Sequence, residues 1–433
     1  MIQSFKIKNF KSYREAELKL APLTVMIGAN ASGKSNAIEA VRFLSWIAQG
    51  QKLSSLQFEV NKNDTVIRGK TGDLIHKGSS FFSIGCTICD NKEGQLWDLN
   101  IDLDIRDKKE IHISNESMEN KSKGEVLYNT IRPTNSMATD ISVAYNNFAR
   151  GGKKPQVICS DQLGIFTQLT RIGVFAPSHK TSRLKIPHVT QLTESLLKSI
   201  LFLDPSPQSM REYSFIDSNG LLGNGSNISA VLFQLMEKNS DNRVFLLDFI
   251  KSLPEQDISD IGFLKGPRGE VMLTLTETFG GYRREIDAGN LSDGTLRVLA
   301  IGAALLSAPE NGMVIIEEID NGVHPSRAEV LLKNIKETAK RRNLTVLLST
   351  HNPALMDAVP SNAIQDVVFC YRDKKDGASK LTSLKEVPDY PELIIQGSLG
   401  DLVTKETLSR FVKSQESSDK KVEKALKWLE SIK

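Results

Sequence analysis

The sequence predicts an α/β fold with a mixed core sheet, and three stretches carry this prediction. Residues 23–44 run from an apolar strand through a loop of small residues into an amphipathic helix. Residues 314–316 form a second apolar strand run, and residues 325–357 add an amphipathic helix and a third apolar run. Strands that alternate with helices are typical of a sheet whose central strands are parallel and buried on both faces.

Composition narrows the class of protein. The 433 residues, 40% of them hydrophobic, are enough for two domains or for one large domain with an insertion. The 55 Lys and Arg residues nearly balance the 52 Asp and Glu residues, so no global basic field marks a nucleic-acid binder, although a local basic patch stays open. The longest apolar runs have about half of the roughly 20 residues that span a membrane, and the N-terminus carries no export signal. We therefore expect a cytoplasmic protein with no membrane partner.

The four cysteines do not predict a metal site. Cys86 and Cys89 form a lone CxxC pair in a strand-like run, where a spacing of three residues places the side chains on opposite faces. Because no second CxxC pair accompanies them, we expect reduced core thiols rather than a zinc or redox centre.

The loop at residues 28–35 predicts a phosphate-binding site. It matches the pattern G-x4-G-K-[ST] without a mismatch, between the strand and the helix that this pattern requires. Glycine gives the backbone the freedom to turn its N–H groups around phosphates. Lys34 can then reach the β- and γ-phosphates of ATP, Ser35 can bind Mg²⁺, and the helix N-terminus adds its positive dipole end. We expect ATP to contact Gly28, Asn30, Ala31, Ser32, Gly33, Lys34, Ser35 and Asn36.

Hydrolysis of ATP needs further groups, and two strand ends supply candidates. Glu317 and Glu318 directly follow the apolar run at residues 314–316. Glu317 is placed to hold Mg²⁺ through water, and Glu318 to polarise the water that attacks the γ-phosphate. His351 follows the next apolar run, so it enters the same crevice and can donate a hydrogen bond to the γ-phosphate or to the attacking water. The candidate catalytic residues are therefore Lys34, Glu318 and His351, and the candidate metal ligands are Ser35 and Glu317.

The order of these motifs resembles the ABC-type ATPase heads of the RecF, SMC and OLD-like group. The resemblance is closest to the stand-alone AAA15/AAA21-type ATPases of bacterial defence modules. The segments that carry it are, in chain order, FKIKNFKSY, GANASGKSN (Walker A), GNGSNISAVLFQL in a helical lobe, LSDGTLR (ABC signature), IIEEIDNGVHP (Walker B and D-loop), STHNP (switch histidine) and GSLGDLV. The resemblance implies a P-loop NTPase with ABC-ATPase head architecture: a mixed core sheet, an antiparallel β subdomain and a helical lobe.

The resemblance also implies that ATP joins subunits. Ser292 and Gly294 would contact the γ-phosphate of ATP bound to a neighbouring subunit, and residues 320–324 would line the seam as the D-loop. From the residues alone, Ser292 caps a helix whose exposed N–H groups also form an anion site. We therefore expect a homodimer or a higher homo-oligomer assembled through ATP-bound heads.

Some features depart from the family pattern. Many ABC heads carry Asp followed by Glu where this chain has Glu317–Glu318, a pair that its stand-alone relatives share. Ile319–Asp320 stand where those relatives more often have Pro and Glu. The glutamine loop of the family is not clear, since Gln162 and Gln168 both precede a predicted strand at residues 171–177.

The chain divides into four predicted parts. They are residues 1–115 (Walker A and an antiparallel β subdomain), 116–290 (insertion, helical lobe and short strands), 291–390 (signature, Walker B and switch histidine) and 391–433 (helical tail).

The elements between the motifs are predicted from their patterning. Residues 81–105 alternate like antiparallel strands, whereas the polar residues 116–160 are typical of a long loop or insertion. Helical spacing places the lobe at residues 186–257, and a strand pair at residues 270–287 leads back to the signature. Residues 420–433 predict an amphipathic helix that docks onto the head or onto a partner.

These features predict an ATPase, converting ATP and water to ADP and phosphate, that acts as a switch. Two heads close on ATP, and hydrolysis opens them. The chain has no sustained heptad repeat, which excludes cohesin-like tethering, and too few residues follow His351 for an appended nuclease domain. The resemblance to defence ATPases therefore predicts control of a separately encoded effector protein, such as a nuclease, in antiviral defence.

Two alternatives stay open. The first is a RecF-like clamp that closes on DNA through the basic segments 149–155 and 179–185, although such charge runs are usually solvated faces. The second is the energy-coupling subunit of a transporter. The strand content between Walker A and the signature, and the late switch histidine, fit the RecF-like group better.

Overall fold

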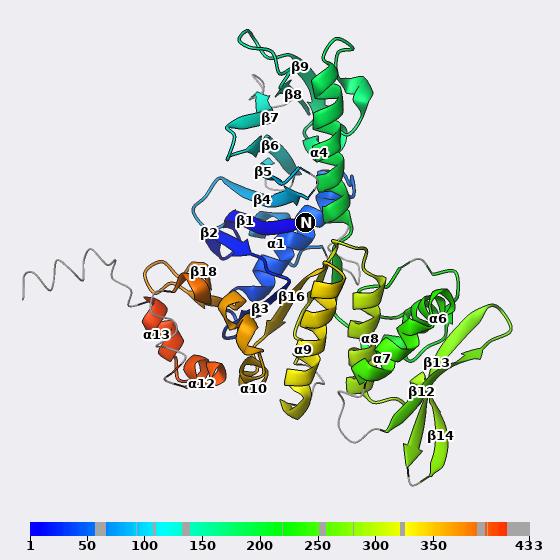
Figure 1. The fold of residues 1–433 in the computed structure, drawn as a ribbon. Helices are drawn as coiled ribbons and strands as arrows, with labels where there is room; N and C mark the ends of the chain where they lie inside the picture. Colours follow the sequence, from blue (N-terminus) through cyan, green and yellow to red (C-terminus); the bar gives the residue numbers. More distant parts are fainter. Residues whose placement is uncertain are drawn as a thin grey trace, which may run out of the picture.

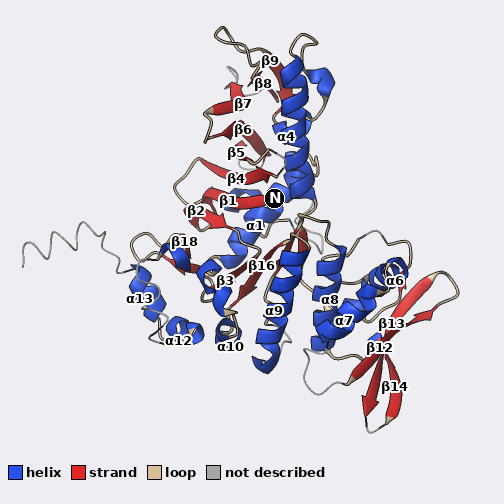
Figure 2. Ribbon diagram, in the orientation of Figure 1, coloured by secondary structure: helices blue, strands red, loops and turns tan. Residues whose placement is uncertain are grey.

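The computed structural model describes residues 1–56, 66–91, 93–106, 110–131, 139–218, 220–250, 257–279, 281–320, 325–387, 395 and 397–413. Within these residues, one 14-stranded sheet runs through the molecule in the order β10-β15-β16-β3-β17-β18-β2-β1-β4-β5-β6-β7-β8-β9. A second sheet contains β11, β13, β12 and β14. Figure 2 shows the long sheet with helices along it and the small sheet at one side.

The strands have the following bounds: β1 Ile2–Phe10, β2 Tyr13–Lys19, β3 Leu23–Ile27, β4 Phe81–Asp90, β5 Gln95–Arg106, β6 Glu110–Asn120, β7 Glu125–Ile131, β8 Asp140–Tyr145, β9 Gln156–Ser160, β10 Leu201–Leu203, β11 Ser214–Phe215, β12 Ile258–Lys265, β13 Glu270–Phe279, β14 Tyr282–Asp287, β15 Met313–Ile316, β16 Thr345–Thr350, β17 Val368–Arg372 and β18 Ser379–Ser383. The α-helices are α1 Lys34–Ala48, α3 Ile165–Gln168, α4 Lys180–Lys198, α5 Pro207–Met210, α6 Ile228–Lys238, α7 Asp241–Ile250, α8 Asp293–Ser307, α9 Pro325–Arg341, α10 Pro353–Asp357, α12 Leu399–Thr404 and α13 Thr407–Lys413.

Five neighbouring strands at one end of the sheet run parallel, namely β10, β15, β16, β3 and β17. Every residue of β3, β15 and β16 is buried, because helices cover both faces. Alternate residues of β3 divide between two cores: Val25 packs with α8 and α9, and Met26 packs with α1. The α/β prediction is confirmed, and the carboxyl ends of these strands share one edge of the sheet.

The other end of the sheet is an antiparallel extension, which Figure 1 shows with α4 lying along it. The predicted strands within residues 81–105 are confirmed as β4 and β5, which pair antiparallel. The prediction of a long loop at residues 116–160 is wrong, because β6, β7, β8 and β9 continue the ladder there. Neighbouring residues of these strands, such as Leu127 and Tyr128, are buried, but polar residues separate the strands in the sequence, so the segment as a whole has the composition of a loop.

The helical lobe is smaller than predicted. The lobe helices α6 and α7 pack against α8 and the small sheet, and the strand pair at residues 270–287 is confirmed as β13 and β14. Residues 190–203, however, do not belong to the lobe. They form the end of α4, which packs on the core of α1, and the edge strand β10, which pairs with β15. The apolar run of β10 follows α4 almost directly, so it continued the helical spacing in the sequence.

Two further predictions need correction. Residues 172–174 form a single 3₁₀ turn instead of the strand predicted at residues 171–177. The predicted division between residues 115 and 116 falls inside β6, because the ladder continues across it. The predicted amphipathic helix at residues 420–433 lies outside the described residues. Of the helices that the structure describes, none is both long enough and apolar enough to cross a membrane.

Candidate functional site

The loop between β3 and α1 has the backbone that a phosphate loop requires. Gly28 and Gly33 have φ angles of 151° and 121°, a region that residues with side chains rarely adopt. A Cβ atom at Gly28 would meet the carbonyl oxygen of Cys370, and one at Gly33 would meet the side chain of Ser379. Both positions therefore need glycine for the φ angle and for the close approach of neighbouring chain.

Side chains from neighbouring parts of the sheet form hydrogen bonds that hold this loop in place. The Tyr13 hydroxyl donates to the Gly33 carbonyl at 3.1 Å, and the Ser379 hydroxyl donates to the Ser32 carbonyl at 2.6 Å. The Asn36 amide donates to the Ser12 hydroxyl at 2.8 Å. Asn36, predicted to contact ATP, thus has a partner within the protein. Asn30 and Ala31 are exposed at the crest of the loop, whereas Ser32 is buried.

Lys34 folds back over the loop. Its Nζ atom donates to the carbonyl oxygens of Gly28 at 2.6 Å and Ala29 at 3.0 Å. Burial lowers the pKa of Lys34 from its ordinary value, and the negative groups Glu318 and Asp320 partly offset that change. Lys34 follows β3, which pairs in parallel with β16, so it lies at the edge of the sheet where the acidic residues follow β15.

Glu317 and Glu318 both follow β15, but their contacts and backbone conformations differ. Glu317 forms an ion pair with Arg42 of α1, with 3.1 Å between the Oε1 and Nη2 atoms. Burial raises the pKa of Glu317, Asp204 raises it further, and Arg42 opposes the change. Glu318 has a φ of 48°, and its N–H donates to the Ser349 hydroxyl of β16 at 3.1 Å. The positive φ turns the chain immediately after Glu317.

His351 lies at the end of β16, beside the residues that follow β15. Its Nδ1 atom is 3.5 Å from Oδ2 of Asp320. The other carboxylate oxygen of Asp320 is buried and has no hydrogen-bond partner among the residues that the structure describes. Because β15, β16 and β3 are parallel, the structure brings Glu318, His351 and Lys34 to one edge of the sheet, as the sequence predicts. Residues 321–324 of the predicted D-loop lie outside the described residues.

The signature residues begin α8. The Ser292 hydroxyl accepts a hydrogen bond from the Thr295 N–H at 3.1 Å, so Ser292 is the N-cap. Ser292 and Asp293 are exposed, while Leu291 anchors the loop in the core. Arg211 holds the loop from the side, donating to the Leu291 carbonyl at 2.9 Å and to the Asp293 carboxylate at 2.6 Å.

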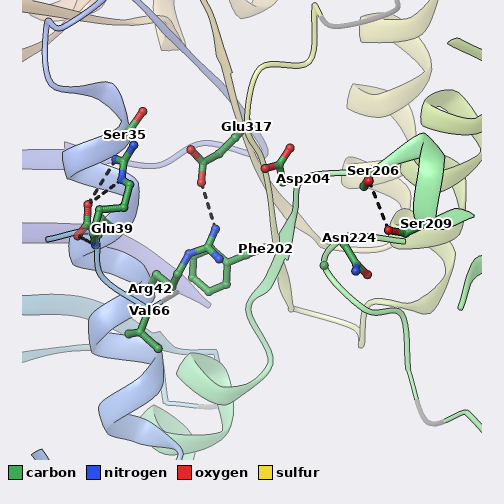
Figure 3. A pocket seen from close by; sticks show the side chains of 12 residues that line it. Ser35, Glu39, Arg42, Val66, Phe202, Asp204, Ser206, Ser209, Asn224 and Glu317 are labelled. Atoms are coloured by element: carbon green, nitrogen blue, oxygen red, sulfur yellow. Dashed lines mark hydrogen bonds and ion pairs between the residues drawn. The ribbon is translucent and has the colours of Figure 1, made fainter. Parts of the chain in front are cut away.

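A pocket of about 490 Å³ opens beside the phosphate loop. Figure 3 shows its side chains, which come from α1, from β10 and the segment after it, from the end of β15, and from the segments that contain Val66 and Asn224. Ser35 and Glu317, the two predicted metal ligands, both line this pocket. The lining residues are Ser35, Glu39, Arg42, Val66, Arg68, Phe202, Asp204, Ser206, Ser209, Gly223, Asn224 and Glu317.

Sequence reasoning missed Arg42 and Asp204 in this pocket. Arg42 carries no motif signal, because its partner Glu317 is 275 positions away in the chain. Asp204 does have a signal in the sequence, since it follows an apolar run just as Glu317 does, but that run also continues the helical spacing of the residues before it. Gln162 and Gln168 lie elsewhere: Gln162 bonds Ser54 and Ile111, and Gln168 bonds the backbone of Ser160.

Within the described residues, no three His, Cys, Asp or Glu side chains form a metal-binding group, and the four cysteines are free thiols. Cys86 is fully buried, and burial raises its pKa to about 12, which makes it an unreactive thiol.

Comparisons with known proteins agree with this geometry. Residues 23–357 match the family described as "AAA domain, putative AbiEii toxin, Type IV TA system". The chain is 24% identical over 424 residues to the "Retron Vc95 probable ATPase" of Vibrio cholerae, covering 91% of this chain and 78% of that protein. It is 22% identical over 401 residues to an "ATP/GTP phosphatase" of Helicobacter pylori, covering 90% of this chain and 94% of that protein.

A solved structure shares the fold. The SMC head bound to the C-winged helix domain of ScpA superposes with a TM-score of 0.50 at 15% identity, covering 88% of this chain and 97% of that chain. The large mixed sheet and the helices around its parallel end are thus those of an ABC-type ATPase head. The chain belongs to the AAA-domain family that residues 23–357 match, and it is an ATPase of this family built on the head fold of SMC proteins.

Proposed function

We propose that this ATPase is a cytoplasmic switch in which Mg²⁺ and ATP join two or more copies of the chain, and that hydrolysis separates them. The observation that carries the proposal is the position of the signature. Ser292 and Asp293 are exposed at the N-terminus of α8, and neither lines the pocket of Ser35 and Glu317. A helix N-terminus attracts anions, so the signature of one copy would bind the γ-phosphate of ATP held by another.

The residues around the pocket fit ATP and Mg²⁺. The Ser35 hydroxyl and the Glu317 carboxylate are the hard oxygen donors that Mg²⁺ prefers. The cation would supply charge neutralisation at the phosphates. Glu318 would polarise the attacking water, His351 would donate a hydrogen bond at the γ-phosphate, and Lys34 would leave the loop carbonyls to bind the β- and γ-phosphates.

We further propose that the switch controls a separate effector protein, in antiviral defence. Two comparisons support a partner: one relative is named as the ATPase of a retron, and the related SMC head is bound to a domain of another protein. Purification of the native chain with and without ATP, followed by mass spectrometry, would identify a protein retained in one state only. A chain that retains no protein in either state would contradict this part of the proposal.

The variant Glu318→Gln tests the switch. It should bind ATP but hydrolyse it about 100-fold or more slowly, because the general base is lost. Light scattering should then show at least a doubled mass with ATP. Glu329→Gln, the same change at an exposed position of α9, is the matched control and should hydrolyse ATP normally. An equal mass of the Glu318→Gln variant with and without ATP would contradict ATP-driven assembly.

DNA clamping is the second candidate, because the fold brings the two basic segments together. The Ser182 hydroxyl of α4 donates to the Asn146 carbonyl at 2.7 Å, and Lys154 donates to the Asn146 side chain at 3.0 Å. Arg150, Lys153 and Lys180 are exposed around this contact. The test is the affinity for duplex DNA at several salt concentrations, with and without ATP. If the protein binds DNA phosphates, this affinity should fall steeply as the salt concentration rises. Weak binding with a flat slope in both states would exclude the clamp.

A further inference from the structure

The strand β9 ends the long sheet on its antiparallel side, and Figure 1 shows it at the top of the molecule. It pairs with β8 on one side, and no strand of the described residues pairs with its other side. An unpaired strand edge presents a row of backbone N–H and C=O groups to which another chain can bind.

The hydrogen bonds to β8 show which residues of β9 point to the open side. The Tyr145 N–H donates to the Pro155 carbonyl at 3.0 Å, and the Asp161 N–H donates to the Thr139 carbonyl at 2.7 Å. The backbone groups of successive residues in an antiparallel strand point to its two sides in turn, so the odd-numbered residues of β9 face β8. The N–H and C=O groups of the even-numbered residues therefore point outward.

One of the outward residues is already paired. The Ser160 N–H donates to Oε1 of Gln168 at 2.9 Å, and Nε2 of Gln168 donates to the Ser160 carbonyl at 2.9 Å. The side-chain amide thus pairs with Ser160 as a residue of a neighbouring strand would. Gln156 and Ile158 have no outward partner among the described residues, so the edge offers their two N–H and two C=O groups to another chain.

The strand β9 lacks the features that usually keep an edge strand from pairing. Its sequence, QVICS, has no charge, proline or glycine, and its five register pairs with β8 are continuous, without a bulge. The edge strands of the small sheet differ from it. β12 has Asp260, Lys265 and a register shift, and β14 is charged at four of its six residues.

The open edge also presents an apolar side chain. Ile158 is 67% exposed, and its side chain lies on the face of the sheet opposite to that of Cys159, which packs in the core. Ile158 is the register partner of Ser142, which in turn is the partner of the exposed Ile131. This row across three strands ends at the open edge, where an aliphatic side chain of an added strand would pack against Ile158.

The charge at the start of β9 favours an acidic partner. The loop of residues 146–155 carries Arg150, Lys153 and Lys154, all exposed, and contains no Asp or Glu. Glu125 of β7 is paired with Lys185 at 2.6 Å and does not neutralise this loop. An acidic group placed beside the loop would therefore be attracted to it.

The end of β9 has no such excess of positive charge. Asp140, the register partner of Ser160, is exposed, as is Arg171 after α3, and the buried Asp161 is paired with Arg106. In a second copy of the chain, β9 and the loop before it also contain no acid, so pairing of two β9 strands would leave both loops uncompensated. The charges thus fit a different protein better than a second copy.

We propose that the open edge of β9 binds an extended segment of a partner protein as an added strand. This segment has an aliphatic residue that packs on Ile158 and acidic residues at the end beside Lys153. Backbone hydrogen bonds to Gln156 and Ile158 would supply affinity, and the side chains would supply selectivity. The inference goes beyond the proposed function, because it requires neither ATP nor a second copy.

The probes for this test are synthetic peptides that the full chain selects from a random phage library. The selected peptides should have an aliphatic residue at the centre and Asp or Glu at one end. Binding should slow amide hydrogen exchange at Gln156 and Ile158 about 10-fold or more, because both amides become hydrogen-bonded. Exchange at Val157, whose N–H already faces β8, should stay unchanged.

Two variants separate the backbone contact from the charge. Ile158→Pro removes an outward N–H and keeps the pairing with β8, so it should weaken peptide binding about 10-fold or more. Lys153→Glu should weaken it about 3-fold or more by repelling the acidic end, whereas Lys333→Glu on the exposed side of α9 should have no effect. Each variant should keep the melting temperature and the ATP hydrolysis of the wild type.

Three outcomes would overturn the proposal. The first is that no peptide is selected, or that the selected peptides bind Ile158→Pro as tightly as the wild type. The second is that duplex DNA binds the wild type in place of the peptides and Lys153→Glu abolishes that binding. The third is that Ile158→Pro lowers the mass seen by light scattering without peptide, because a second copy would then occupy the edge.

Discussion

The guanidinium of Arg42 lies 3.1 Å from the carboxylate of Glu317, which connects α1 to the end of β15 across the pocket. Both side chains are 25% exposed, so the pair is worth about 0.5–1 kcal/mol. Arg42→Gln removes a positive charge from the proposed cation site. We expect Mn²⁺, used as a probe for the metal and measured by electron paramagnetic resonance, to bind the ATP complex about 2- to 5-fold more tightly at pH 8.

The same variant, Arg42→Gln, should change the pH dependence of Mn²⁺ binding. Glu317 must be ionised to bind a cation, and its pKa is raised, so binding should fall as the pH falls through that raised pKa. Because Arg42 lowers the pKa of Glu317, Arg42→Gln should shift the loss of binding to higher pH. Arg183→Gln on α4 is the control. Identical pH profiles for Arg42→Gln and the wild type would show that the ion pair does not act on the site.

Lys34→Ala should lower the affinity for ATP. The ammonium group would form charged hydrogen bonds to the phosphates, worth about 1.5–3 kcal/mol, which corresponds to a loss of about 10- to 100-fold. A fluorescent ATP analogue measures the change, and Lys198→Ala on α4 serves as the control. Wild-type turnover in Lys34→Ala would mean that the phosphate site has been assigned wrongly.

Gly33→Ala should destabilise the loop more than a comparable change elsewhere. Its φ is 121°, and the added Cβ would clash with the Ser379 side chain. Gly50→Ala, at a φ of 75° with open space around it, controls for the positive φ and should cost about 1–2 kcal/mol. We expect Gly33→Ala to cost a further 1–3 kcal/mol, roughly, in urea unfolding. Equal costs for the two variants would show that the loop relaxes away from Ser379.

Arg211→Ala should weaken the assembly of subunits through the signature loop. Arg211 bonds both the Leu291 carbonyl and Asp293, so its loss frees the loop at the start of α8. We expect ATP binding by the single chain to be unchanged and ATP-driven assembly of the Glu318→Gln background to weaken. Light scattering at several protein concentrations measures this. Arg243→Ala, which removes an exposed ion pair with Asp260, is the control.

Glu116 should make the stability of the protein depend on pH. Burial raises its pKa to about 7, although Tyr128 and the N–H groups of Ile165 and Phe166 donate to it. The folded state therefore holds a proton that the unfolded state releases near pH 4.5. The free energy of unfolding should fall by about 3 kcal/mol as pH rises from 4.5 through 7.

Urea unfolding at several pH values checks this prediction. Glu116→Gln cannot ionise, so it should flatten the profile between pH 5 and pH 8. Glu119→Gln, the same change on the opposite face of β6, should keep the wild-type slope. An unchanged slope in Glu116→Gln would assign the pH dependence to other groups.

The motifs whose conformation depends on residues close together in the chain could be predicted from the sequence. The loop at residues 28–35 depends on two glycines and on the strand and helix beside it, all within 22 residues of chain. The strands before Glu317 and His351 are buried at every residue and contain short apolar runs, so their type and direction followed from their own residues and the helix between them. The parallel core and its acidic edge could therefore be inferred before the fold was known.

The antiparallel extension and β10 could not be predicted in this way. The short strands β7 and β8 lie between polar residues, so residues 116–160 as a whole have the composition of a loop, and only the pairing with neighbouring strands shows that β7 and β8 are strands. The three residues of β10 are too short to show a period of their own, and their pairing with β15 makes them a strand.

The sequence by itself determined the phosphate loop, the signature cap and the acidic strand end, because backbone freedom, capping and burial are properties of short segments. Only the tertiary structure decided which charges face the metal side of the pocket. Arg42, Asp204 and Glu317 come from three distant segments, and parallel pairing of β10 with β15 brings two of them together. Electrostatic energy depends on the distance between charges in space. The number of residues between two charges in the chain does not give that distance.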